Sequence, residues 1–257
     1  MPHEFSLADD LVMGLRLYSR LPTGSRPHLA PDISRIAMAL PIASLIIGLG
    51  PAVLLTALVL AGAPAFLATA LASAAYVAIT GAMGEDALAD SFDGLFGGQT
   101  KERRLEILKD SRHGTFGVAA MIFLVVIRIA CLAPLAEANA YAAGALWLAA
   151  GILARSGSLW LMSALPPARA SGLSADAGRP SRPAFGLGIF IAIALAFILA
   201  GPFKGIFGLG LAVLVGAAIA YGWQRLCRHL VGGQTGDLVG GLQALLEIAV
   251  LCAFILS

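Results

Sequence analysis

Long runs of apolar residues constrain this chain more than any other feature of its sequence. Seven such runs cover residues 36–62, 64–84, 117–136, 141–165, 185–201, 206–223 and 242–256. A helix needs about 20 apolar residues to cross a bilayer, and all but the last run come close to that length. The last run is shorter and contains Glu247. The runs therefore predict an all-α, polytopic transmembrane bundle of seven spans, or of six if the last run does not cross.

The composition supports a membrane protein. Charged residues make up 12% of the chain and hydrophobic residues 59%, whereas a soluble domain carries about 25% charged residues. The three cysteines have no metal-ligand or disulfide spacing and are expected to be small core residues. We expect the 257 residues to form a single integral membrane domain.

Basic residues are distributed unevenly among the segments that connect the apolar runs. They concentrate in segments 1–35, 85–116, 166–184 and 224–240. The other connections contain only Lys204. Because basic connections face the cytoplasm, this alternation predicts a cytoplasmic acidic and basic segment at 85–116 and a C-terminus on the outside. Residues 4–20 predict a short amphipathic helix on the membrane surface.

Segment 85–116 begins with a cluster of acids. Glu85, Asp86, Asp90 and Asp93 fall within nine residues. If the second run continues as helix past Gly84, the three aspartates lie within roughly 40–60° of one another on one face. Like charges at this spacing need a counter-charge, and carboxylates without His or Cys suit Mg²⁺ or Mn²⁺. We therefore predict a metal site; the alternative is a solvated polar face.

A basic stretch follows, "KERRLEILKDSRHGTFG" at 101–117, which predicts a short charged helix. Polar side chains gather at its end: Lys109, Asp110, Ser111 and Arg112. Basic groups beside a carboxylate-held metal suit an anionic substrate, so Lys109 and Arg112 are predicted to contact phosphate. His113 is treated as an ordinary surface residue.

A third polar segment is the glycine-rich "GGQTGDLVGGLQ" at 232–243, predicted to be a loop on the same side of the membrane. It contains Gln234, Thr235 and Asp237. An acid among glycines favours a binding loop, although a plain interhelical turn would also explain the glycines. No P-loop, dinucleotide-binding fingerprint or nucleophile elbow occurs.

Two arginines, Arg128 and Arg155, interrupt apolar runs. A charge inside the bilayer is costly, so both are expected to face the bundle interior. Snorkelling toward the membrane surface or a structural pair with Glu247 on the one hand, and a functional role on the other, are equally open.

The motifs "EDALADSFDGLFGG", "KERRLEILKDSRHGTFG" and "GGQTGD" resemble the adenosylcobinamide-GDP ribazoletransferase family, also called cobalamin 5′-phosphate synthase. The family's acidic pattern falls on Asp86, Asp90 and Asp93, and its "TGD" on 235–237. Its "KDSR-GT-G" falls on 109–117 and leaves position 113 open. The chain departs from many members at Gly84, where they have His, and at Ala87, where they have Gly.

The resemblance implies an enzyme that joins GDP-activated adenosylcobinamide to α-ribazole or its 5′-phosphate and releases GMP. It implies a bacterial inner-membrane protein whose active site faces the cytoplasm, with no nucleic acid partner. Glycine-rich spans such as 205–222 would allow a homo-oligomer.

The resemblance also assigns roles to individual residues. The metal ligands would be Asp86, Asp90, Asp93 and Asp237, holding Mg²⁺ or Mn²⁺. The substrate-binding residues would be Lys109, Ser111, Arg112, Gln234 and Thr235. The proton acceptor would be Asp93 or Asp110.

Two other functions stay open on the sequence alone. A CDP-alcohol phosphatidyltransferase also uses clustered aspartates and a divalent ion, but its usual "DG-x-x-AR" opening is missing. A cation-coupled transporter would place ionisable groups near the midplane on broken helices, whereas here the acids lie at the end of a run beside basic residues.

Overall fold

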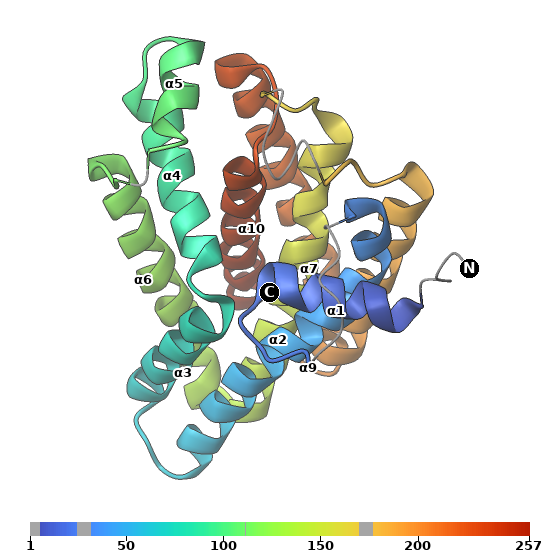
Figure 1. Ribbon diagram of the computed structural model, residues 1–257. Coiled ribbons are helices and arrows are strands. Elements are labelled where there is room, and N and C mark those ends of the chain that lie inside the picture. Colours follow the sequence, from blue (N-terminus) through green and yellow to red (C-terminus); the bar gives the residue numbers. More distant parts are fainter. Residues whose placement is uncertain (1–5, 25–31, 111, 170–176) are drawn as a thin grey trace.

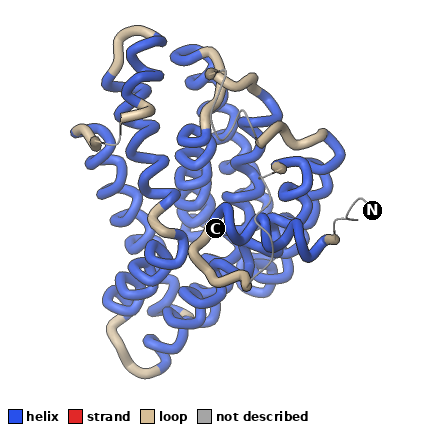
Figure 2. Tube along the Cα trace, viewed as in Figure 1, coloured by secondary structure: helices blue, strands red, loops and turns tan. Residues whose placement is uncertain are grey.

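The computed structural model describes residues 6–24, 32–110, 112–169 and 177–257, and these fold as a helical bundle (Figures 1 and 2). The helices are α1 (Leu7–Tyr18), α2 (Ile33–Leu60), α3 (Ala65–Thr80), α4 (Met83–Gly97), α5 (Lys101–Ile107), α6 (Thr115–Ala138), α7 (Ala140–Ala164), α9 (Arg182–Val231) and α10 (Gly236–Leu256). The predicted all-α polytopic bundle is confirmed.

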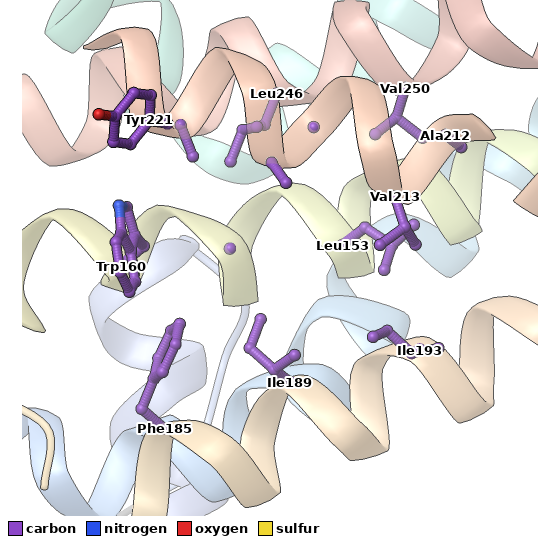
Figure 3. Close-up of a pocket in the computed structure, with 14 residues that line it drawn as sticks. Leu153, Trp160, Phe185, Ile189, Ile193, Ala212, Val213, Tyr221, Leu246 and Val250 are labelled. Carbon is purple, nitrogen blue, oxygen red and sulfur yellow. The ribbon is translucent and has the colours of Figure 1, made fainter. Parts of the chain in front are cut away.

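Length and composition identify five helices in the described residues that could cross a membrane, or six when α3 and α4 count as one bent span. This count takes α9 as one helix, although α9 contains two of the predicted runs. Gly205 breaks α9 with a φ of 62°, a left-handed conformation that glycine adopts readily. Phe185 and Tyr221, on either side of the break, line one cavity (Figure 3). The two arms of α9 therefore face the same cavity.

The expected helix past Gly84 is confirmed, because α4 carries Asp86, Asp90 and Asp93 together, but the expected unbroken continuation from the second apolar run is wrong. α3 ends at Thr80, and both Gly81 (φ 67°) and Ala82 (φ 60°) adopt left-handed conformations. α4 then leaves at 84° to α3. The physical reason is the glycine C-cap, which ends a helix by reversing the sign of φ.

The predicted loop at 232–243 is also wrong beyond Thr235, because α10 begins at Gly236. Thr235 caps that helix by accepting a hydrogen bond from the Leu238 N–H. Gly240 and Gly241 lie inside the helix, where a Cβ on either residue would sit 2.5 Å from an atom of α4. These two glycines allow α4 and α10 to pack closely, and they do not form a flexible loop.

The predicted amphipathic helix is confirmed as α1, and residues 4 and 5 lie outside the described residues. Ser6 and Asp9 form a capping box at its start. Met13 and Tyr18 are buried, and Asp10 pairs with Arg35 of α2. α1 is thus fixed against the first spanning helix.

A buried ionic network crosses the bundle interior. Arg128 of α6 donates to Glu247 of α10 (2.8 Å) and to Glu85 of α4 (3.0 Å). Trp147 donates to the same Glu247 carboxylate at 3.0 Å. The structural alternative for Arg128 is thereby confirmed. Arg155 contacts the Tyr76 hydroxyl instead, at 2.7 Å.

A matched pair of glycine substitutions tests the packing of α9 on α2. A Cβ on Gly188 would overlap the carbonyl oxygen of Ala37 in α2, whereas Gly186 has open space around it. We expect Gly188→Ala to destabilise the protein by about 1–3 kcal/mol, as overpacking does. Gly186→Ala should be neutral or stabilising by up to about 1 kcal/mol. Thermal unfolding of both variants in detergent measures the difference, and equal melting temperatures would contradict this packing.

Candidate active site

Two aspartates and a histidine meet where α4 faces the segment that leads into α6. Asp86 and Asp90 lie one turn apart on α4, and His113 precedes α6. The imidazole Nε2 is 3.6 Å from an oxygen of Asp86, and Nδ1 is 3.6 Å from an oxygen of Asp90. One ligand atom from each residue lies within 4.8 Å of the other two. We call Asp86, Asp90 and His113 the acid–histidine cluster.

His113 is a residue of this cluster that the sequence does not predict, because a lone histidine in a charged block is usually an ordinary surface residue. The one sequence signal that it belongs to the site is its position inside the motif at 109–117, which follows the acids. What the sequence does not show is that the turn before α6 returns to the aspartates of α4.

Asp93 is buried and its carboxylate faces α6. One oxygen accepts a hydrogen bond from the Gly114 N–H (2.6 Å), and the other accepts one from the Gly117 N–H (2.9 Å). These N–H groups belong to the start of α6, where a helix lacks internal acceptors. Asp93 therefore fixes the segment that carries His113. Its predicted metal and proton-acceptor roles stay predictions.

Asp237 joins the site from the first turn of α10. The Ser91 hydroxyl of α4 donates to the Asp237 carbonyl at 2.9 Å and ties the two helices together. The Thr235 hydroxyl lies 3.5 Å from the Asp237 carboxylate. Ser91 follows Asp90 directly, so its bond to Asp237 holds the first turn of α10 against the turn of α4 that carries Asp90. The structure thus brings the third polar segment to the acid–histidine cluster.

Gln234 is completely buried beside Asp237. Its backbone pairs with the segment after α7, donating to Pro166 O and accepting from Ala168 N, each at 2.8 Å. Its side-chain oxygen and nitrogen have no partner among the described residues. Its predicted role in substrate binding stays a prediction, as does that of the capping residue Thr235.

The basic end of the charged block is exposed. Arg112 donates to the Asp110 carboxylate at 2.6 Å, and Lys109 is exposed. The Arg112 guanidinium lowers the pKa of Asp110 to about 2 through these hydrogen bonds. Ser111 lies outside the described residues. The predicted phosphate contacts of Lys109 and Arg112 stay predictions.

The low pKa of Asp110 has a consequence for pH dependence. Because it lies below the ordinary value of about 3.9, the pair with Arg112 stabilises the segment above about pH 4. This contribution is lost as the pH falls toward about 2. Asp110 is therefore ionised throughout the neutral range. We expect Asp110→Asn to leave the acid limb of a pH–rate profile where it is; a displaced limb would contradict this.

Comparison with known proteins identifies one family. The family model described as cobalamin-5-phosphate synthase matches residues 10–255. A protein of Azorhizobium caulinodans named adenosylcobinamide-GDP ribazoletransferase is 38% identical over 255 residues, covering 98% of this chain and 96% of the relative. A protein of Bradyrhizobium diazoefficiens with the same name is 40% identical over 243 residues, covering 94% and 91%. No solved structure matches the chain. A match over nearly the whole length places this chain in the cobalamin-5-phosphate synthase family of enzymes.

Proposed function

We propose that this protein joins GDP-activated adenosylcobinamide to α-ribazole or α-ribazole 5′-phosphate and releases GMP. The observation that carries this proposal is the acid–histidine cluster in a chain of this family, with its aspartates on the first two turns of α4 close to the start of α10. The names of the relatives supply the donor and the reaction class. Acids beside exposed basic residues suit a substrate that carries a diphosphate.

The residues of the cluster fit a divalent cation. Asp86 and Asp90 offer carboxylate oxygens, and Mg²⁺ typically takes one or two carboxylates together with substrate phosphates. His113 adds a nitrogen, which suits Mn²⁺ better than Mg²⁺. A bound divalent cation would neutralise charge on the diphosphate. We therefore assign Asp86 and Asp90 to the metal, with His113 completing the set.

The reaction requires one proton transfer. The acceptor's ribose hydroxyl oxygen bonds to the phosphorus next to the corrinoid, the phosphoanhydride bond breaks, and GMP leaves with the bonding electron pair. The hydroxyl proton passes to a carboxylate. Asp93 uses both oxygens to hold α6, and Asp110 is held by Arg112. We therefore assign the proton to Asp237, which the Ser91 hydroxyl holds against the turn of α4 that carries Asp90, and give Asp93 the task of positioning His113.

The orientation in the membrane is part of the same proposal. The site end carries the basic residues of α5, whereas at the other end Lys204 donates to the last residue, Ser257, at 3.1 Å. By the positive-inside rule, the site would face the cytoplasm of a bacterial inner membrane.

The test is a reaction with purified protein in lipid nanodiscs. The nanodiscs receive GDP-cobinamide and α-ribazole, singly and together, with Mg²⁺, with Mn²⁺, or with EDTA. We expect GMP release that needs both substrates and a divalent cation. Release that needs no acceptor would contradict the transfer reaction, and release unaffected by EDTA would contradict the metal. Cobinamide-independent ion uptake into proteoliposomes of the same lipid would favour the transporter instead.

A further inference from the structure

A cavity of about 300 Å³ lies between the two arms of α9 where they pack on α7 and α10 (Figure 3). Its walls are almost entirely apolar. Representative lining residues are Leu153, Trp160, Phe185, Ile193, Val213 and Tyr221. Ala217, which also lines it, is exposed. The acid–histidine cluster contributes no residue to it.

The two ends of this cavity differ in chemistry. Figure 3 shows Trp160, Phe185 and Tyr221 gathered at one end, and Ile193, Ala212 and Val250 at the other. At the aromatic end the Trp160 indole donates to Gln224 at 3.2 Å. Aromatic side chains with one polar group are typical of the membrane–water interface. The cavity therefore runs from an interfacial end into an apolar interior.

The aromatic end is also positively charged. Arg225 donates to the Tyr221 hydroxyl at 3.3 Å, and its guanidinium carbon lies 5.9 Å from the centre of the Tyr221 ring. Arg182 lies one turn before Phe185 on the other arm. Neither α7 nor α9 contains an aspartate or glutamate. The charge at this end suits an anion at the membrane surface.

The shape of the cavity suits a single extended chain. From Phe185 to Ile193 the first arm rises about 12 Å. Unfilled space would deprive the lining atoms of dispersion contacts, and water does not enter an apolar cavity. In a bilayer the available filler is a hydrocarbon chain.

We propose that this cavity binds an acyl chain of an anionic phospholipid, with the lipid phosphate at Arg225 and Arg182. The lipid would complete the packing between the arms of α9, which the break at Gly205 leaves apart at this level. An arginine near the membrane surface favours an anionic lipid by about 1 kcal/mol, which is about fivefold in affinity for each residue.

Tryptophan quenching by brominated lipids tests the proposal. The protein is placed in two kinds of phosphatidylcholine nanodisc. In one, about a tenth of the lipid is dibrominated phosphatidylglycerol, and in the other the same share is dibrominated phosphatidylcholine. The fluorescence of the Trp160→Phe variant is subtracted from that of the wild-type protein, and the difference is the signal of Trp160. We expect phosphatidylglycerol to quench Trp160 with about 25-fold preference over phosphatidylcholine, about fivefold from each of Arg225 and Arg182. Equal quenching by the two lipids would mean non-specific surrounding lipid and would overturn the proposal.

Two pairs of variants locate the site. Ala217→Phe fills the cavity from its rim and should abolish the preferential quenching. Leu214 is exposed and does not line the cavity, so Leu214→Phe should leave the preferential quenching unchanged. Arg225→Gln should reduce the preference about fivefold. Arg228→Gln, also exposed but three residues further on, should leave it unchanged. Preferential quenching that survives both Ala217→Phe and Arg225→Gln would overturn the proposal.

Discussion

Asp90→Asn will lower the rate of GMP release by about a hundred- to a thousandfold, while the protein stays folded. The substitution keeps the size of the side chain and removes the negative charge of Asp90. That carboxylate lies 3.6 Å from His113 and belongs to the same cluster as Asp86. Removing one electrostatic contact to developing charge typically has an effect of this size. The measurement is GMP release at saturating substrate across a titration of Mg²⁺, with thermal unfolding recorded in parallel.

The matched control is Glu106→Gln. Glu106 belongs to the same charged block but is exposed and pairs only with Arg103 among the described residues. Its loss should change the rate by less than about twofold, since exposed ion pairs contribute little. A rate for Asp90→Asn within tenfold of the wild-type rate, at every concentration of Mg²⁺, would refute the metal assignment.

Arg128→Met is expected to be the most destabilising of the substitutions considered. Arg128 is 1% exposed, and it is the cation shared by Glu247 and Glu85, which are 2% and 7% exposed. Its removal leaves two carboxylates in the interior without this partner. Breaking a buried pair in this way costs about 3–5 kcal/mol. Unfolding by heat or by sodium dodecyl sulfate in mixed micelles measures the loss.

Two further variants separate a buried ionic effect from lost packing. Arg128→Met combined with Glu247→Leu removes one of the stranded charges, and we expect it to be more stable than Arg128→Met alone. Arg103→Met breaks an exposed pair and should cost less than about 1 kcal/mol. If Arg128→Met unfolds at the same temperature as Arg103→Met, the network does not stabilise the bundle as described.

Much of the candidate site was predictable because its motifs are local in the sequence. The acids of α4 and the acid of α10 were selected from sequence, and Arg128 with Glu247 was weighed as a pair. The position of Asp93 was not predictable, because its carboxylate faces N–H groups twenty-one and twenty-four residues away. His113 was missed for the same reason, since its importance depends on the turn that returns it to α4.

The sequence by itself determined that this chain is an all-α membrane bundle with an amphipathic helix before the first span and a concentrated acidic segment. Hydrophobic length, charge distribution and helix capping are properties of neighbouring residues, so they can be read along the chain. Only the tertiary structure decided that Gly81 turns α4 away from α3 and that Gly240 and Gly241 bring α10 against α4. The break at Gly205, by contrast, lies between two runs that the sequence already separates. Because glycine has no side chain, it can allow a turn, a helix break or the close approach of two helices. Which of these occurs at a given glycine depends on the residues that pack against it.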